Sequence, residues 1–200
     1  YNEVPVVLGA ALAQKAPIVA LHLTRPPVTI PDREKLGMAS HFEAARGAYL
    51  LRDFKPGAPR QGTVFIQGTS TTANLVSVLS KLDAAGVNVR IVAVISPQLF
   101  ALQDEAYRVS IASPASLWDA MCITNRSLRT MQEWIVNPVV GEYSLASDWD
   151  NRWRTGGSLD EVVDEAHLGP VHILEGIKRF AAERTARLAK LRAAVDAASR

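Results

Sequence analysis

The chain has very little cysteine: Cys122 is the only one among its 200 residues. A single thiol cannot form an intrachain disulfide, so the sequence predicts a fold held by packing in a reducing compartment. Charge of one sign is also scarce, because the formal net charge at pH 7 is only +2 and the basic residues form no long block. This balance argues against nucleic acid as a partner.

Long apolar runs are absent as well. No stretch approaches the roughly 18 to 20 apolar residues that cross a bilayer, and no signal-peptide pattern opens the chain, so we expect no membrane role. The sequence begins at Tyr1 rather than Met and enters a helical pattern almost at once. We therefore expect a piece of a longer protein.

The clearest pattern lies over residues 62–97. Residues 63–67 form a short apolar, β-rich run that ends at Gly68, as a fully buried strand does. Apolar residues at helical spacing follow and end at Gly86, and residues 89–95 form a second apolar run. The order strand, helix, strand predicts a βαβ unit with a right-handed crossover and a parallel sheet.

The loop Gly68-Thr69-Ser70-Thr71 joins the first of these strands to the helix. Free backbone N–H groups, the helix dipole and the hydroxyls make this corner a candidate anion site. The loop has neither the phosphate-loop lysine nor the full glycine pattern of dinucleotide sites. The other interpretation is that Ser70 or Thr71 only caps the helix.

The same stretch and the residues after it resemble a known family. The more specific pieces are Leu99-Phe100 and the run Gln103-Asp104-Glu105-Ala106-Tyr107-Arg108, which follow the βαβ unit. Together these segments resemble the C-terminal domain of the transketolase family of thiamine-diphosphate enzymes. The resemblance implies a three-layer α/β/α sandwich with a mostly parallel five-stranded sheet.

The N-terminal residues resemble the end of the pyrimidine-binding domain of the same family. Asn2 is a plausible helix cap, a helix runs to about Lys15, and residues 18–24 read as a strand followed by Arg25. In transketolases an arginine at this point helps to hold the phosphate of the sugar-phosphate substrate, and its planar donors suit that task. Pro26 stands where the family usually has glutamine.

The resemblance implies two domains joined by a linker. Residues 1–28 would be the end of the pyrimidine-binding domain, and the polar, proline-interrupted residues 29–46 the interdomain linker. Residues 47–200 would be the transketolase C-terminal-like domain with a long C-terminal helix. Its first element, residues 47–52, would be a strand added to the sheet.

Other elements follow from periodicity and turn residues. They are a short helix within 97–107, a strand over 117–124, a helix over 128–135, a last strand over 139–143, a helix that starts with a capping box at Ser158, and a helix over 172–198.

Two further features have no assigned ligand. Trp149 and Trp153 alternate with acidic and basic residues, and we expect a packed or subunit-contact loop there rather than a ligand site. His167 and His172 lie five residues apart with no evident third ligand, so we expect two surface imidazoles rather than a metal pair.

The resemblance implies a pentose phosphate pathway transferase that moves a two-carbon ketol unit between sugar phosphates. Thiamine diphosphate and Mg²⁺ would bind in parts of the homodimeric, cytoplasmic enzyme outside this chain, which would be structural and inactive alone. The alternatives are the same domain of a 2-oxoacid dehydrogenase E1 component or of a deoxyxylulose phosphate synthase. A third is a standalone module that binds a phosphorylated ligand at the Gly68 loop.

Overall fold

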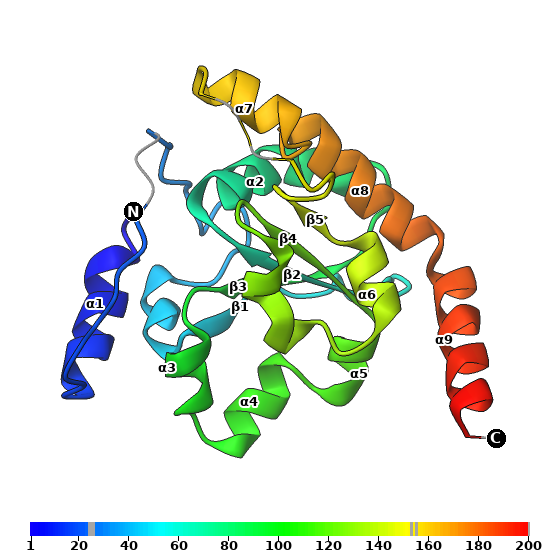
Figure 1. Ribbon diagram of the computed structural model, residues 1–200, viewed down its shortest axis with the longest axis horizontal. Coiled ribbons are helices and arrows are strands. Elements are labelled where there is room, and N and C mark those ends of the chain that lie inside the picture. Colours follow the sequence, from blue (N-terminus) through cyan, green and yellow to red (C-terminus); the bar gives the residue numbers. More distant parts are fainter. Residues whose placement is uncertain (24–26, 153, 155, 200) are drawn as a thin grey trace.

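A five-stranded sheet forms the centre of the protein in the computed structural model, which describes residues 1–23, 27–152, 154 and 156–199 (Figure 1). The strand order is β1-β3-β2-β4-β5. The strands are β1 (Ala48–Arg52), β2 (Thr63–Gln67), β3 (Arg90–Val94), β4 (Ala120–Thr124) and β5 (Leu145–Ala146). β1 runs antiparallel to β3, and the other neighbours are parallel. The predicted mostly parallel five-stranded sheet is confirmed.

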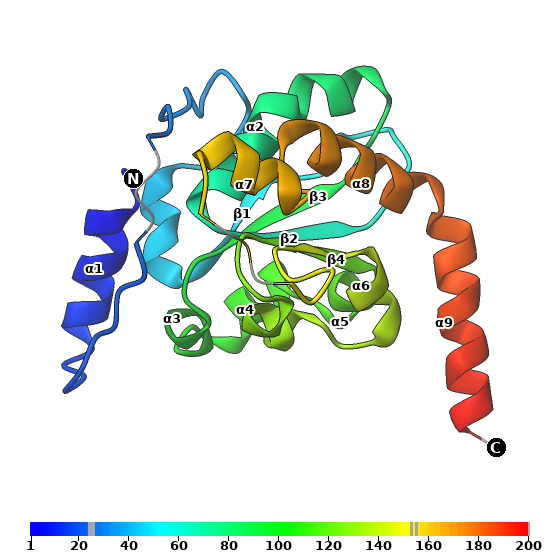
Figure 2. The same ribbon diagram turned by 45° about the horizontal axis from the view of Figure 1, so that its top comes forward.

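Helices cover both faces of the sheet, which gives the three predicted layers (Figure 2). One face carries α2 (Thr69–Ala84), α7 (Leu159–Glu165) and α8 (Pro170–Ala182). The opposite face carries α3 (Pro97–Ala101), α4 (Glu105–Ile111), α5 (Pro114–Trp118), the 3₁₀ helix η2 (Leu128–Trp134) and α6 (Pro138–Tyr143). All five residues of β2 and of β4 are buried, because continuous apolar strands suit a sheet covered on both sides.

The central βαβ unit forms as the sequence predicts. β2 and β3 are parallel with Val64 opposite Ile91, and α2 connects them. Gly86 follows α2 with φ +70°, a conformation that favours glycine over other residues. The expected short helix after β3 is two helices, because Asp104 starts α4 by accepting a hydrogen bond from the Tyr107 N–H.

The expected strand over 139–143 is wrong, because these residues lie in helix α6. Asn137 caps that helix by accepting a hydrogen bond at 3.0 Å from the Val140 N–H, and Pro138 occupies its first turn. Both residue types favour a helix start at these positions. The fifth strand, β5, follows immediately after α6 and pairs with β4.

The expected strand over 18–24 does not form in its described part, residues 18–23. Ile18 is 83% exposed and Leu23 is 63% exposed. A strand needs a neighbour for its backbone hydrogen bonds, and the described sheet lies elsewhere in the chain. The helix before it does form, as α1 (Val4–Ala13), although Glu3 rather than Asn2 is its cap residue.

The expected single helix over 172–198 is two helices. α8 ends at Ala182 and α9 (Arg184–Ala198) begins after Glu183, and α9 extends away from the sheet (Figure 2). α8 packs on α2 and buries Ile173 and Ile177, as predicted for the first half of the helix. The change of direction lets Arg187 of α9 reach Asp119, just before β4.

Candidate functional site at the carboxyl ends of β2 and β4

The sheet has a topological switch point between β2 and β4. The chain leaves β2 into α2 on one face and leaves β4 toward η2 on the other. In open α/β sheets, ligands bind in the crevice outside the carboxyl ends of two such strands. Gly68 follows β2 and Asn125 follows β4, so these residues lie at this edge of the sheet.

Gly68 has a backbone that only glycine adopts readily. Its φ is +101°, and a Cβ at this position would collide with the Asn125 side chain and lie 2.9 Å from Thr71 Oγ1. The Asn125 amide therefore lies directly over the Gly68 backbone, and its Nδ2 donates a hydrogen bond to Ser70 Oγ at 3.3 Å. Glycine is required here both for its conformation and for the close approach of Asn125.

Neither Ser70 nor Thr71 caps α2, so that interpretation of the loop is wrong. Gly68 occupies the cap position, and among the described residues no side chain accepts a cap hydrogen bond from the first turn. Thr71 Oγ1 instead donates to the Gln67 carbonyl at 2.6 Å, and Thr72 Oγ1 donates to the Gly68 carbonyl at 2.7 Å. The threonine hydroxyls tie the loop to the end of β2, while the α2 N–H groups keep no side-chain acceptor.

A buried polar network lies beside this loop. The Gln67 side chain is buried, and its Oε1 accepts hydrogen bonds at 2.9 Å from the hydroxyls of Thr124 and Thr130. These bonds join the carboxyl ends of β2 and β4 to η2. The sequence signal for this network was a glutamine at the end of an otherwise apolar strand. The partners of Gln67 lie about 60 residues away in the chain, so the sequence did not reveal them.

The chemistry of this corner suits binding better than catalysis. The positive end of the α2 dipole and its uncapped N–H groups favour an anion. Asn125 Oδ1 is buried without a hydrogen-bond partner among the described residues. The Thr71 hydroxyl is already donating to carbonyl groups, so it is not poised as a nucleophile.

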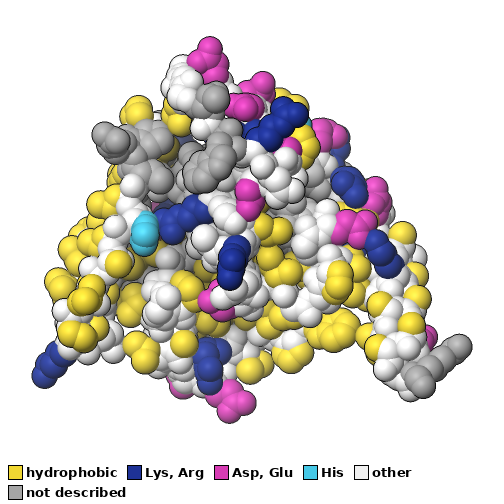
Figure 3. All heavy atoms as spheres, in the orientation of Figure 1, with side chains coloured by type: hydrophobic (Ala, Val, Ile, Leu, Met, Phe, Trp, Pro, Cys, Tyr) yellow, Lys and Arg dark blue, Asp and Glu magenta, His cyan; other side chains and the backbone are white. Residues whose placement is uncertain are grey.

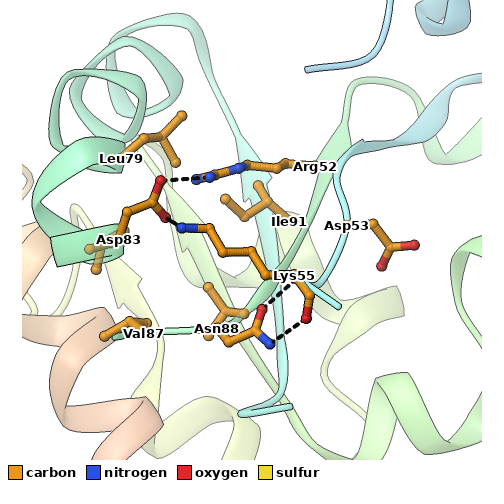
Figure 4. A pocket seen from close by; sticks show the side chains of 10 residues that line it. Arg52, Asp53, Lys55, Leu79, Asp83, Val87, Asn88 and Ile91 are labelled. Atoms are coloured by element: carbon orange, nitrogen blue, oxygen red, sulfur yellow. Dashed lines mark hydrogen bonds and ion pairs between the residues drawn. The ribbon is translucent and has the colours of Figure 1, made fainter. Parts of the chain in front are cut away.

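A small hollow lies at the opposite end of the sheet, between β1, β3 and the end of α2 (Figure 4). Its volume is about 10 Å³, enough for roughly one water molecule and too small for a sugar phosphate. Asp83 accepts hydrogen bonds there from Arg52 at 2.7 Å and forms an ion pair with Lys55 at 2.8 Å. Burial alone would raise the pKa of Asp83, but these two cations outweigh it and hold the pKa below its ordinary value. The hollow is a closed ion-pair cluster rather than a ligand site.

Comparison with known proteins gives one curated relative, the plasmid transketolase of Cupriavidus necator. It is 29% identical over 164 residues, which cover 82% of this chain and 22% of the relative. The structure also matches the transketolase of Leishmania mexicana, with a TM-score of 0.55 and 15% identity over 72% of this chain and 19% of that one. The resemblance to transketolases is confirmed.

Another transketolase, that of Pichia stipitis in complex with sedoheptulose 7-phosphate, has the same fold over 72% of this chain and 19% of its own, with a TM-score of 0.51 and 18% identity. No family model matches the sequence. The chain thus spans about a fifth of the length of the transketolases it matches. That share is consistent with the predicted C-terminal portion.

The transketolase resemblance points to Arg25, which lies outside the described residues, as does Trp153 of the tryptophan-containing loop. Within the described part of that loop, the Arg154 side chain forms contacts inside the protein. Its guanidinium pairs with Asp150 at 2.6 Å and donates to the Ser147 carbonyl at 2.9 Å. These contacts favour the expected packed or subunit-contact loop over a ligand site.

Metal-binding clusters and membrane-spanning helices are both missing from the residues that the structure describes. Among them, no three His, Cys, Asp or Glu side chains converge in a way that could hold a metal ion. No helix in this part of the chain is both long and apolar enough to cross a bilayer. Cys122 is buried, and burial raises the pKa of its thiol to about 12, so it is not a poised nucleophile.

Proposed function

We propose that this chain is the C-terminal portion of a transketolase-like enzyme that transfers a two-carbon ketol unit between sugar phosphates. The observation that carries the proposal is the similarity to a curated transketolase over 164 residues, together with the matching fold. The sequence likeness and the fold likeness both point to transketolases.

The cofactor and its metal are assigned to other parts of the complete enzyme. Thiamine diphosphate supplies the electron sink for the carbanion, and the protein supplies orientation and charge. In this proposal the chain itself is structural: it buttresses the neighbouring domain and supports a cytoplasmic homodimer.

We assign residues 1–28 to the end of a preceding pyrimidine-binding domain and residues 29–46 to the linker. α1, which is described in full, has no buried residue although eight of its ten residues are Val, Leu or Ala. Leu12 is 60% exposed, and hydrophobic side chains gather over α1 in the space-filling view (Figure 3). A helix that is apolar all round is normally buried, which supports a covering domain in the complete enzyme.

A polar network fastens α1 to the sheet across the linker. Arg33 of the linker forms an ion pair with Glu3 at 2.5 Å and donates a hydrogen bond to the Tyr49 hydroxyl of β1 at 2.9 Å. The Tyr49 hydroxyl in turn donates to Glu3 at 2.5 Å. Burial and the Glu3 carboxylate raise the pKa of Tyr49, so it remains a neutral donor. The network would set the angle between the two proposed domains.

Glu3→Gln should loosen α1 without unfolding the sheet. Hydrogen bonds to charged groups contribute about 1.5–3 kcal/mol, so amide exchange in α1 should become about 10- to 100-fold faster. Glu43→Gln is the control, because the Arg46–Glu43 pair spans 3.7 Å and both side chains are more than 40% exposed. Equal exchange rates in the two variants would show that the network does not hold α1.

Arg25 is proposed to bind the phosphate of the substrate at the entrance of the complete active site. Its support is the position of this arginine in the Thr-Arg-Pro segment after α1. In the complete enzyme, Arg25→Gln should raise KM for sugar phosphates about 10- to 100-fold, because the free energy of one charge-assisted hydrogen bond corresponds to a loss of affinity of that size. The kcat should stay nearly unchanged. Arg25→Lys should restore part of the affinity. An unchanged KM would remove Arg25 from the phosphate site.

A ligand-binding role for the Gly68 loop is the second candidate function. It rests on the uncapped first turn of α2 at the switch point. A nuclear magnetic resonance titration with inorganic phosphate should then shift the amides of Thr69, Ser70 and Thr71 to saturation, and Gly68→Ala should abolish the shifts. No shift of these amides at millimolar phosphate would end this candidate.

The two alternative enzymes, a 2-oxoacid dehydrogenase E1 component and a deoxyxylulose phosphate synthase, differ from a transketolase in their substrate. A complete protein that decarboxylates pyruvate, alone or with a lipoyl acceptor, would be a deoxyxylulose phosphate synthase or an E1 component instead. The assay that separates these alternatives from ketol transfer uses the same protein with a ketose phosphate or with pyruvate as donor.

A further inference from the structure

Three aromatic rings from three segments form one continuous stack beside the switch-point edge. The indole of Trp149, in the loop after β5, lies 4.3 Å from the His167 ring with an interplanar angle of 19°. The His167 ring lies 4.6 Å from the His172 ring, and these two planes differ by only 7°. His167 follows α7, and His172 is in the first turn of α8.

His167 holds its place in the stack despite an unfavourable backbone. Its φ is +55°, in the left-handed region where glycine or asparagine is favoured after a helix. The turn is completed by hydrogen bonds from the His167 N–H to the Asp164 carbonyl at 2.9 Å and from the Leu168 N–H to the Val163 carbonyl at 3.0 Å. A histidine in a glycine position, sandwiched between two rings, indicates that the imidazole has a role of its own.

The geometry also disfavours a shared metal ion. The lone pairs of an imidazole lie in the plane of its ring, and two nearly parallel rings 4.6 Å apart do not direct them at one point between the planes. The expected surface imidazoles are thus a stacked pair rather than two separate side chains.

Few charges face the stack. Asp164 Oδ1 of α7 lies 4.0 Å from His172 Nδ1, which is buried without a hydrogen-bond partner among the described residues. In the loop after β5, Asp150 is paired with Arg154, which also contacts Glu165 of α7 at 3.5 Å.

Other described neighbours of the stack are engaged in contacts elsewhere or are uncharged. Asp148 of the loop accepts a hydrogen bond from the Leu128 N–H at 3.0 Å. On α8, Glu175 is paired with Lys178 at 2.9 Å, and on α2 the nearby contact is the neutral Asn74, which donates to the Leu168 carbonyl. Because His172 lies in the first turn of α8, the positive end of that helix dipole also faces it.

We propose that the Trp149–His167–His172 stack is an acid-sensitive contact. The rings stay stacked with at most one protonated imidazole and separate when both imidazoles are protonated. A single imidazolium at His167 is stabilised by the indole face. Two imidazoliums stacked 4.6 Å apart repel each other, and among the described residues Asp164 is the carboxylate that contacts the pair. Acid adds protons to imidazole rings, so the stack stays closed at the higher pH and opens as acid supplies the second proton.

Opening would release a defined part of the molecule. α7, which is described throughout, has no buried residue of its own, although Val163 packs partly against the core and Glu165 contacts Arg154. The Leu168 carbonyl after α7 also accepts a hydrogen bond from Asn74 of α2, so the stack adds to a small set of contacts that hold α7. α8 would stay in place, because Ile173 and Ile177 are fully buried in the core. The moving part is therefore α7 with the Trp149 loop, and the proposal does not depend on the enzyme assignment.

Nuclear magnetic resonance of the chain, titrated from about pH 8 to about pH 5, tests this contact across the imidazole range. At the higher pH, ring currents should shift the Trp149 and His167 ring protons upfield, with nuclear Overhauser contacts between the two rings. At the lower pH, most of the upfield shift and the contacts should be lost, while core resonances of the central strand, such as those of the buried Val64, stay unchanged. Retention of the stack after both imidazoles have titrated would overturn the proposal.

A variant separates double protonation from any other effect of acid. His172→Gln leaves one imidazole beside Trp149, so its upfield shift should persist at about pH 5. His167→Asn keeps the left-handed turn but removes the central ring, so Trp149 should lack the shift at every pH. Loss of the Trp149–His167 contact at low pH in His172→Gln would show that acid acts elsewhere and would overturn the proposal.

Discussion

Asp119→Asn should destabilise the protein by about 3–5 kcal/mol, because it leaves a buried guanidinium without its counter-charge. The Asp119 carboxylate accepts hydrogen bonds from Arg187 at 2.5 Å and from Arg184 at 2.6 Å. The Arg187 side chain is only 1% exposed, and its guanidinium lies 3.6 Å from the centre of the Phe180 ring. Burial lowers the pKa of Arg187, and Asp119 is the main opposing influence. The amide of asparagine keeps the shape of the side chain but not its charge.

Urea denaturation measures this effect against a matched control. Arg184→Gln removes the other partner of Asp119, but the Arg184 side chain is 41% exposed, so the loss should stay within about 1 kcal/mol. The double variant Asp119→Asn with Arg187→Met removes both buried charges and should recover part of the loss. Similar losses from Asp119→Asn and Arg184→Gln would mean that the buried pair does not fasten α9 to the sheet.

Gly47→Ala should cost more than about 4 kcal/mol or prevent folding. Gly47 has φ +83°, and an added Cβ would overlap the Ser96 carbonyl oxygen and the Phe100 nitrogen and lie 2.8 Å from Leu99 Cβ. The first two are backbone atoms that cannot move aside. The Gly47 carbonyl also accepts hydrogen bonds at 2.8 Å from the N–H groups of both Ile95 and Ser96. β1 therefore enters the sheet directly against the start of α3.

Gly57→Ala separates the steric effect from the conformational one. Gly57 has a similar φ of +76°, but no atom lies within 4 Å of its added Cβ. The cost at Gly57 should be about 1–2 kcal/mol, that of a left-handed backbone for alanine. Thermal unfolding of both variants checks the comparison, and equal losses would show that the contact with α3 is not tight.

The sequence predicts those elements whose signals are local. Continuous apolar strands around α2 and the capping box at Ser158 lie within a few residues of the structure they specify, and both form. The same kind of signal was available at Asn137-Pro138, a cap followed by a first-turn proline, but the apolar residues after it read as a strand. Residues 18–23 show the converse, since their strand-like composition has no partner in the described sheet.

The candidate site could be predicted only in part. The sequence places Gly68 at the end of β2, because a strand, a glycine and a helix are adjacent in the chain. It could not place Asn125 over Gly68 or join Gln67 to Thr130, because those contacts depend on how β2 and β4 pair. The spacing of His167 and His172 in the sequence likewise did not predict that their rings stack. The fold stacks them and places Trp149 against His167.

Ketol transfer by the complete natural protein that contains this chain is the most direct test of the proposed function. The assay would supply thiamine diphosphate, Mg²⁺, a ketose phosphate and an aldose phosphate, and would run the 200-residue chain in parallel. We predict transfer by the complete protein and none by the chain alone. A complete protein that binds the cofactor but transfers no ketol unit from any ketose phosphate would contradict the account, as would turnover by the isolated chain.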